Sequence, residues 1–495
     1  MERNIEKEIG SSRNRYRHWV TVFLVLFAVA GCAAVGPDYV RPDIKAPAQW
    51  NTVAADPDGI GKADPDALAA WWHTLDDPVL NRLIDAAAAS NLDVKSALSR
   101  VREARARKAK SAASQLPGVD ATASAQKRLS SSATGSSETS ELYSTGLDAG
   151  WEIDLFGGIR RSVEAAQADI EAGIEDLNDV MVTLLAEVAL NYIDIRTYQA
   201  RLAVTSKNID AQQQTWEILE TLFQAGMGDA LAVDQARYNL ESSRAKIPDL
   251  NVGLAEAINR LVVLTGQPSE TLRRMVAEVR SVPMATLKLA VGVPADLLRR
   301  RPDIRRAERE LAAQTARVGE AEAARYPTFT LNGSIGLDAL SIGNLFASGS
   351  RSGSFGPAFN WRLFDGGALR ANVQVQGELQ QQARLSYEAS VLNAVEEVEN
   401  ALMAFVQEQQ KYDALTAATD SARSASDVAA YQYTTGLIGF SDVLDAQRSL
   451  LSFEDQLAQS RGTLLSNLVR LYKALGGGWQ TFEQASSSDS SDDRG

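Results

Sequence analysis

The sequence predicts a mixed α/β membrane protein with long coiled-coil α-helices and a transmembrane β-barrel, built from two internal repeats. Three observations carry this prediction. An apolar residue recurs at every seventh position over an unusually long run. The same run and its landmarks reappear 210 residues later. Ahead of each run lie stretches in which apolar and polar residues alternate.

The heptad run extends from Arg161 to Phe223 without a proline, and Gly173 is its only glycine. An apolar repeat of seven held this long is typical of an α-helix that coils around neighbouring helices. At about 1.5 Å per residue, the helix would be on the order of 95 Å long, far beyond the needs of a globular domain. Its apolar positions are Ile174, Met181, Val188, Ile195, Leu202, Ile209, Trp216 and Phe223.

The second run lies 210 residues downstream, at Val391, Val398, Phe405, Tyr412, Thr419, Ser426 and Tyr433. The same offset pairs Asp93 with Asp303, Pro117 with Pro327, Trp151 with Trp361 and Gly226 with Gly436. Two unrelated helices could share a heptad by accident, but co-registered Trp, Pro and Gly favour one supersecondary unit used twice. We predict a signal peptide with a lipobox at 1–31, a lipidated extended strap at 32–78, helix-strand-strand-helix repeats at 79–282 and 283–478, and a disordered acidic tail at 479–495.

The N-terminus has the pattern of a bacterial export signal. Arg13, Arg15 and Arg17 precede an apolar core from Val20 to Ala30, which is too short to span a bilayer. Val29–Cys32 then resembles a lipobox, so Cys32 is the predicted site of lipid attachment, and acyl chains there would anchor the chain on a membrane. The residue after the cysteine is Ala33, and not the aspartate that favours retention of such lipoproteins in the inner membrane. By this resemblance, the chain is expected in the outer membrane. The alternative is a buried structural cysteine.

The elements that follow are predicted from composition and alternation. The Pro-, Ala- and Asp-rich residues from Ala33 to Pro78 should lie along a surface without forming a core. A helix is expected from Leu92 to Gln115, ended by Pro117. Four alternating stretches are expected as strands: 119–126, 143–154, 328–337 and 354–363.

Each stretch has about the length of a tilted transmembrane strand, with one apolar and one polar face. Aromatic residues suited to a membrane-interface girdle are Tyr143, Trp151, Phe355, Phe359 and Trp361. A half-buried soluble sheet would alternate in the same way, and the implied outer-membrane address favours the barrel. Four strands leave two open edges, so other copies must supply the rest, and three copies would give twelve strands around a water-filled lumen.

Glycine pairs after each strand pair, Gly157-Gly158 and Gly366-Gly367, are expected to convert strand into long helix. Each long helix should turn at Gly226 or Gly436, where positive φ is easiest for glycine. Return helices are then expected at about 232–264 and 441–475, the first of them kinked by Pro248.

Composition argues against several functional classes. The net charge of −13 becomes two charges more negative without residues 1–31, which does not favour nucleic acid. One cysteine and two histidines (His18 and His73) nearly exclude a zinc site, and six scattered methionines disfavour a ladder for soft metals. No phosphate loop, nucleophile elbow or HExxH motif is present. We therefore expect no enzyme activity, no metal and no cofactor beyond the lipid on Cys32.

Four motifs give the chain a family resemblance: VGPDYVRP at Val35–Pro42, VPADLLRRRPD at Val293–Asp303, WRLFDGG at Trp361–Gly367 and DVLDAQR at Asp442–Arg448. In this order they resemble the outer-membrane efflux proteins of the TolC/OprM/NodT type, most closely the lipoprotein branch that serves RND pumps. The resemblance covers nearly the whole chain after residue 31. It implies a homotrimer in the outer membrane, in which twelve strands form the β-barrel and twelve helices continue it into the periplasm as a long coiled-coil α-helical barrel. It also implies an adaptor (membrane fusion) protein and an inner-membrane RND transporter as partners, and drugs, solvents, dyes or metal ions as substrates.

The resemblance also places function at the helix tips, where the family has its periplasmic gate and its adaptor-docking surface. Asp442 and Asp445 match the family's gate aspartates and lie on one helix face, where a three-fold axis would gather them into charged rings. Alternatively, Asp442 begins the return helix and interacts with its N-terminal N–H groups. Tyr433 matches a gate aromatic, but it also lies on the heptad seam, where core packing is the preferred interpretation.

The docking tips would comprise Gly226, Gly436, Asp234 and Ile438. Ile438 stands where the family often has an arginine, which places a salt bridge from that position in doubt. The first repeat has Ala232 where an acid would match, with Asp234 nearby, so the acidic ring is expected from the second repeat. Two alternatives to an efflux duct remain: a secretion outlet for an ABC exporter, and a coiled-coil scaffold lipoprotein without a pore, which would leave the four strands unexplained.

Overall fold

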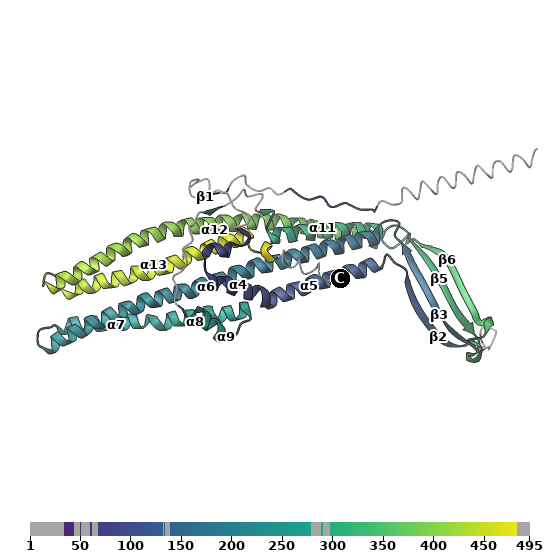
Figure 1. Ribbon diagram of the computed structural model, residues 1–495. Helices are drawn as coiled ribbons and strands as arrows, with labels where there is room; N and C mark the ends of the chain where they lie inside the picture. The colour runs from purple at the N-terminus through teal and green to yellow at the C-terminus, as the bar shows by residue number, and fades with distance from the viewer. Residues whose placement is uncertain are drawn as a thin grey trace, which may run out of the picture. The chain divides into compact units, whose positions relative to one another are not determined.

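The computed structural model describes residues 34–43, 50, 60–61, 68–131, 133, 139–278, 289–290 and 298–482 (Figure 1). The predicted signal peptide, Cys32 and most of the acidic tail lie outside these residues. The chain divides into two compact units. Unit 1 is Met1–Pro42, Arg100–Gly173 and Arg306–Glu388, and unit 2 is Asp43–Ser99, Ile174–Arg305 and Ala389–Gly495.

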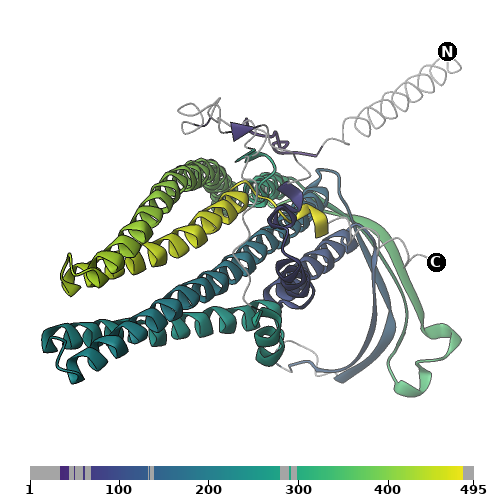
Figure 2. The ribbon, with the colours of Figure 1, turned by 60° about the vertical axis from the view of Figure 1, so that its left-hand side comes forward.

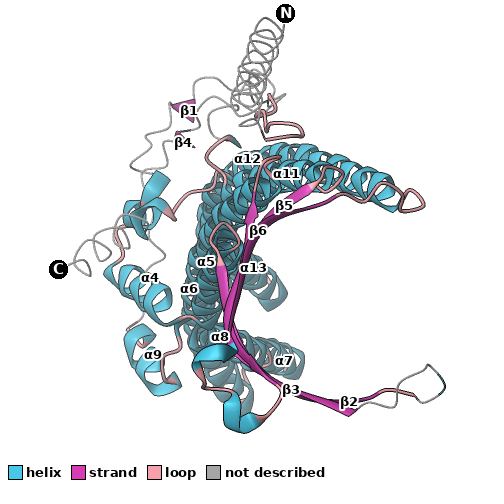
Figure 3. Ribbon diagram, turned by 90° about the vertical axis from the view of Figure 1, so that its right-hand side faces the viewer, coloured by secondary structure: helices cyan, strands magenta, loops and turns pink. Residues whose placement is uncertain are grey.

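Unit 1 holds a four-stranded sheet in which every neighbouring pair is antiparallel. Its order is β2-β3-β5-β6, formed by β2 (Gly118–Leu129), β3 (Thr139–Ile153), β5 (Thr328–Ala339) and β6 (Arg351–Asn360). The four predicted strands are thus confirmed, although the last one ends at Asn360 and not at Leu363. Figure 3 shows that the sheet is curved. Among the residues that the structure describes, each edge strand, β2 and β6, pairs with one neighbouring strand only.

The register keeps the predicted alternation on the two faces of the sheet. Ala121 lies opposite Leu147, and Leu147 lies opposite Ile335, so one face is apolar across three strands. Two of the predicted girdle residues also tie strands to helices. The indole N–H of Trp151 donates to the carbonyl of Gln115 at 2.9 Å, and that of Trp361 donates to the carbonyl of Arg325 at 3.2 Å. Each tryptophan thereby holds the end of the helix that precedes its hairpin.

The helices follow the repeat closely. A 22-residue helix precedes each strand pair, α5 (Leu92–Ala113) and α11 (Pro302–Ala323), and a 67-residue helix follows it, α6 (Gly158–Gln224) and α12 (Ala368–Thr434). The return helices are α7 (Ala230–Arg244) with α8 (Lys246–Thr265), and α13 (Phe440–Ala474). Figure 2 shows the two helical hairpins in teal and in yellow-green. Among the described residues, none of the helices combines the length and apolarity required to cross a membrane.

Pro248 interrupts the first return helix, as predicted. Helix α7 ends at Arg244 and α8 begins at Lys246, so the proline occupies the first turn of α8. Its ring nitrogen has no hydrogen to donate to the carbonyl of Arg244, which a continuous helix would need. The second return helix has no proline at this place and runs unbroken for 35 residues.

The segment Val35–Pro42 is held on the helices of unit 1 by polar contacts. Arg161, buried on α6, donates to Asp38 Oδ1 at 2.7 Å and to the carbonyl oxygen of Val35 at 3.3 Å. On α11, Glu308 accepts from the hydroxyl of Tyr39 at 3.0 Å and pairs with Arg41 at 2.8 Å. This motif therefore fastens the chain, directly after the predicted lipid site, to the helices that continue from the sheet.

Part of the predicted strap is core and not surface, so the expectation for 68–78 was wrong. Trp71 and Trp72 are 1% and 2% exposed and belong to a short 3-10 helix, η2 (Trp71–Leu75). Trp71 stacks on Tyr472 at 5.5 Å, and Trp72 stacks on Phe482 at 6.0 Å. Trp479, assigned to the tail, is buried beneath the guanidinium of Arg305.

Two helices of unit 2 were not predicted, α4 (Pro78–Ser90) and α9 (Ser269–Val276). Asp77 caps α4 by accepting from the N–H groups of Val79 and Leu80 at 2.8 and 3.3 Å. A two-residue parallel pair, β1 (Ile60–Gly61) with β4 (Leu289–Ala290), was not predicted either.

A buried polar network surrounds Arg196 of α6, which is fully buried. Its guanidinium donates to the hydroxyl of Tyr192 at 2.9 Å, to Gln199 Oε1 at 2.8 Å and to the carbonyls of Val276 and Glu278 at 3.3 and 2.6 Å. Tyr192 in turn donates to Asp77 Oδ2 at 2.5 Å. Burial, and then this hydrogen bond, raise the pKa of Tyr192 well above its ordinary value. The network joins the caps of α4 and α9 to the long helix.

Candidate functional site at the helix tips

Both helical hairpins turn on a glycine with the same geometry. Gly226 and Gly436 each have φ of +72°, and an added Cβ would meet nothing within 4 Å at either position. The N–H of Met227 donates to the carbonyl of Leu222 at 2.9 Å, and Leu437 makes the equivalent bond to Gln432 at 2.9 Å. This is the Schellman termination of a helix, and the left-handed backbone, not lack of space, calls for glycine.

The two hairpins of unit 2 share one apolar core just behind these turns. Its buried members are Leu219, Ala232, Val233, Ala236, Ala429, Phe440, Val443 and Leu444. Two pairs of repeat equivalents belong to it, Leu219 with Ala429 and Val233 with Val443. The tips are therefore level with each other. Phe223, predicted as the last seam residue of α6, lies outside the core and is 44% exposed.

Tyr433 and Ile438 pack against this core and are partly buried. The ring of Tyr433 lies 5.4 Å from that of Phe440, with 59° between the ring planes. Within one chain, Tyr433 therefore packs against the core, and its role in a gate remains a prediction. Ile438 fills an apolar place in the same core, where an arginine would bring a charge.

Asp442 lies in the first turn of α13 and is exposed. Its Oδ2 accepts from the N–H of Gly439 at 3.2 Å, while the carbonyl of Gly439 accepts from the N–H of Asp442 at 3.2 Å. A carboxylate in this position accepts a hydrogen bond from an N–H group that would otherwise be unpaired, and its negative charge interacts favourably with the positive end of the helix dipole. The helix-start role is therefore present in the chain, and the predicted gate role of Asp442 is compatible with it because the residue is exposed.

Asp445, one turn further along α13, is 75% exposed at its side chain and lies 3.4 Å from Nη1 of Arg448. Arg448 also reaches across to the other hairpin. Its Nε donates to Asn239 Oδ1 at 2.9 Å, its Nη2 donates to the hydroxyl of Tyr238, and its guanidinium lies over the Tyr238 ring at 5.2 Å. The cation therefore ties α13 to α7 and holds Asp445 on the same side.

Arg448 was quoted in the sequence motif without a role. The signal that could have identified it is its spacing, because Asp445 and Arg448 at i, i+3 lie on one helix face. Its partners on α7 could not be found in this way, since they lie about 210 residues away in sequence. Asp234 of α7 is exposed and outside this cluster, so the structure does not bring it together with Asp442 or Asp445.

Replacing Arg448 with methionine is expected to loosen the contact between the hairpins, because three charge-assisted contacts are lost at once. Amide hydrogen exchange in the first turns of α13 and in α7 should become faster. Arg244→Met is the matched control, since Arg244 contacts Glu241 and Gln213 of its own hairpin only. Equal acceleration in both variants would contradict the assigned tie.

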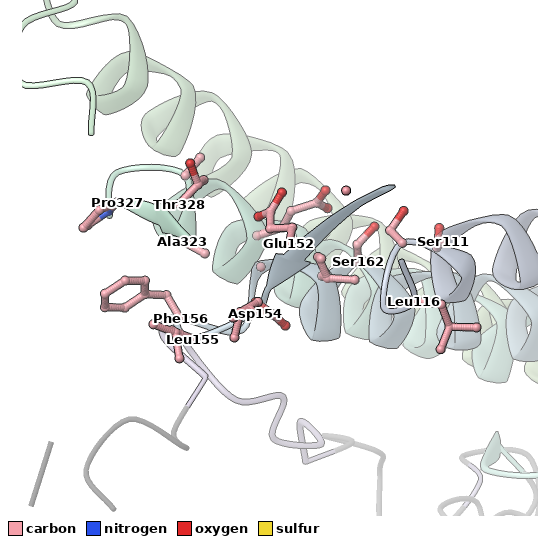
Figure 4. A pocket seen from close by; sticks show the side chains of 17 residues that line it. Ser111, Leu116, Glu152, Asp154, Leu155, Phe156, Ser162, Ala323, Pro327 and Thr328 are labelled. Atoms are coloured by element: carbon pink, nitrogen blue, oxygen red, sulfur yellow. The ribbon is translucent and has the colours of Figure 1, made fainter. Parts of the chain in front are cut away.

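A second concave region lies in unit 1, where the strands meet the helices (Figure 4). It has a volume of about 530 Å³ and its lining includes Glu152, Asp154, Ser162 and Glu320. Asp154 Oδ2 accepts from the N–H of Arg160 at 2.9 Å, and burial raises the pKa of Glu320. In the described part of the chain, no group of three or more His, Cys, Asp or Glu residues is placed to hold a metal ion.

The family model described as "Outer membrane efflux protein" matches the chain twice, at residues 83–267 and 293–477. Nodulation protein T of Rhizobium leguminosarum bv. trifolii is 32% identical over 481 residues, which is 95% of this chain and 99% of that protein. The solvent efflux pump outer membrane protein SrpC of Pseudomonas putida is 34% identical over 460 residues, covering 92% and 97%.

A solved structure titled for the outer-membrane channel OprN superimposes with a TM-score of 0.84 and 37% sequence identity, covering 90% of this chain and all of that one. The paired strands and paired long helices described above are thus those of an outer-membrane channel. The two matches of the family model have the same 210-residue offset as the helices and strands. The chain belongs to the outer membrane efflux protein family.

Proposed function

We propose that the protein is the outer-membrane exit channel of a tripartite efflux system, which passively conducts small toxic compounds delivered by an inner-membrane RND pump through a periplasmic adaptor. The observation that carries this proposal is the nearly full-length similarity to efflux channels together with a four-stranded sheet whose two edges are open. A scaffold without a pore would have no use for such a sheet. The proposed transport involves no catalysis.

The assembly proposed is a homotrimer in the outer membrane. Three copies would supply twelve strands, which removes every open edge in lipid. The helical hairpins would extend into the periplasm, with their tips toward the adaptor. Lipid attached at Cys32 would add a second anchor. The segment Val35–Pro42 supports this, because it fastens the chain beside the helices that continue from the sheet.

At the tips, a three-fold axis would bring three copies of Asp442 and Asp445 into rings of like charge, which favour cations. Ion conductance in a planar lipid bilayer tests the channel directly. We expect the purified protein to conduct and to prefer cations in a KCl gradient. Changing both aspartates to alanine should shift the reversal potential toward lower cation preference, while Asp234→Ala should leave it unchanged. A protein that conducts in neither form is not a channel.

The partners can be identified by crosslinking in cells from cysteines at Met227 and Leu437, which are 73% and 72% exposed at the two turns. Val252 on α8, 57% exposed and away from the turns, is the control position. Capture of a periplasmic adaptor together with an RND pump supports the proposal. Capture of an ABC exporter's adaptor would instead assign the protein to secretion, and capture from the control alone would contradict tip docking.

A further inference from the structure

The apolar face of the four-stranded sheet carries charged residues at one end only. Within the described strands these residues are Lys127 of β2, Glu141 of β3 and Arg351 of β6. They lie near the strand ends that the hairpin loops join, away from the ends that continue into helices. A charge on a lipid-facing strand is costly in the middle of a membrane and much less so near its surface. These positions therefore suit one boundary of a membrane.

The two hairpins have the same pairing at this end but different charges. In the first hairpin, Lys127 lies opposite Glu141, and Lys127 Nζ is 2.8 Å from Glu141 Oε1. The equivalent pair of the second hairpin, 210 residues further along, is Leu337 opposite Arg351. Arg351 is exposed, and among the described residues it forms no ion pair. One positive charge is therefore left over on this face, in a chain whose net charge is −13.

Apolar side chains follow Arg351 toward the middle of the sheet. Phe355, on the same face of β6, is 79% exposed, and Ile335 of β5 is 67% exposed. Between Arg351 and Phe355 the face has Gly353, which lies opposite Ile335 and has no side chain. The start of β6 is fixed by Ser350, whose hydroxyl donates to a carbonyl of the β5–β6 loop at 2.6 Å. A cation held at the edge of an exposed apolar surface suits a lipid with an anionic headgroup.

We propose that Arg351 binds a phosphate group of lipid A, the phosphorylated glycolipid of the outer leaflet, while Ile335 and Phe355 contact its acyl chains. This inference rests on the proposed place of the protein in the outer membrane. Because the helices extend into the periplasm in that proposal, the hairpin loops and Arg351 lie at the outer surface. A guanidinium donates two parallel hydrogen bonds to one phosphate, which an ammonium group cannot do.

The other end of the apolar face favours the outer leaflet as the source of the lipid. There the face carries only aromatic and aliphatic residues within the described strands, among them Trp151, Ile153, Phe329 and Phe359. Such rings suit a membrane boundary without requiring a particular headgroup. The unpaired cation is present only at the end where lipid A, with its phosphates next to its acyl chains, would lie.

Native mass spectrometry of the full-length protein, purified from membranes and washed free of lipid in detergent, tests this site. The probe is lipid A with both phosphates, added over a range of concentrations. We expect Arg351→Gln to weaken the apparent Kd for lipid A by about tenfold, because one charge-assisted contact with phosphate is lost. Arg351→Lys keeps the positive charge and should retain most of the binding.

Arg128→Gln is the control variant. Arg128 is also an exposed arginine near this end of the sheet, but it lies on the polar face of β2. Its substitution should leave the Kd for lipid A unchanged. The ligand is varied in parallel. Lipid A without its phosphates, and the phosphorylated disaccharide without its acyl chains, should each bind much more weakly than intact lipid A.

Unchanged binding in Arg351→Gln, or equal weakening in Arg128→Gln, would overturn the site. Equal binding of the lipid without phosphates would contradict phosphate recognition, and displacement by inorganic phosphate would mean a site for a free anion and not for a lipid. Conductance in a planar bilayer separates this inference from the proposed function. A protein that conducts but binds lipid A equally well without Arg351 lacks only this site. One that binds lipid A through Arg351 and never conducts is not an exit channel.

Discussion

Replacing Arg196 with methionine is expected to destabilise the helical unit by ~3–5 kcal/mol. The substitution removes the donor from Gln199 Oε1, from the hydroxyl oxygen of Tyr192 and from the carbonyl of Glu278, and a buried acceptor left without a partner costs about 1–3 kcal/mol. The carbonyl of Val276 also loses Arg196 but still accepts from Gln199 Nε2 at 2.8 Å. One nitrogen of the guanidinium, Nη2, is buried without a partner, and relief of that group offsets part of the loss. Urea denaturation followed by far-ultraviolet circular dichroism measures the change.

Arg201→Met is the matched control on the same helix. Arg201 makes a bidentate pair with Asp455 at 2.8 and 3.1 Å, but its side chain is 24% exposed. A pair of this kind contributes about 1 kcal/mol or less. If the two variants shift the denaturation midpoint by the same amount, the buried network does not hold α4 and α9 to α6 in the manner described.

Trp71→Ala should produce a loss of similar size, ~3–5 kcal/mol, because a large buried ring is replaced by a cavity. The ring stacks on Tyr472 and meets Trp72 edge-on at 5.8 Å, so the substitution also removes two aromatic contacts. The same urea measurement applies, and limited proteolysis should show faster cleavage near η2. Tyr431→Ala, at a position 69% exposed on α12, should change stability by no more than about 0.5 kcal/mol.

A Trp71→Ala variant as stable as the Tyr431→Ala variant would mean that the aromatic cluster is not part of the core. Trp71→Phe should fall between the two, since it keeps an aromatic ring but loses part of the volume.

Most of the helices and strands could be predicted, because the spacing of apolar residues shows which face of a helix or strand packs against the rest of the protein. The heptads of α6 and α12 and the alternation of the four strands extend over many residues, and the repeat allowed each half to check the other. Helix α9 was not predicted, because its eight residues are too few to show a helical periodicity of apolar positions. Trp71 and Trp72 were misjudged because the composition around them is that of a loop, while their burial depends on α13 and residues after it.

At the helix tips, too, some features could be predicted from the sequence and others could not. Both turn glycines and the helix start at Asp442 could be found from the sequence, because a positive φ and a helix start have local signatures, whereas Asp445 was named from the family resemblance. The tie made by Arg448 could not, since its partners on α7 are brought to it only by packing of the two hairpins.

The equal length of α6 and α12, 67 residues each, constrains how this protein can change. Deleting one heptad from a single long helix and its return helix would shift that tip by roughly 10 Å along the axis, about two helical turns. Leu219 would then no longer meet Ala429 and Phe440, and Arg448 would lose its partners on α7. Length can therefore vary in evolution or in engineering only by matched steps in both repeats, and relatives with longer or shorter tunnels should carry their insertions and deletions in pairs.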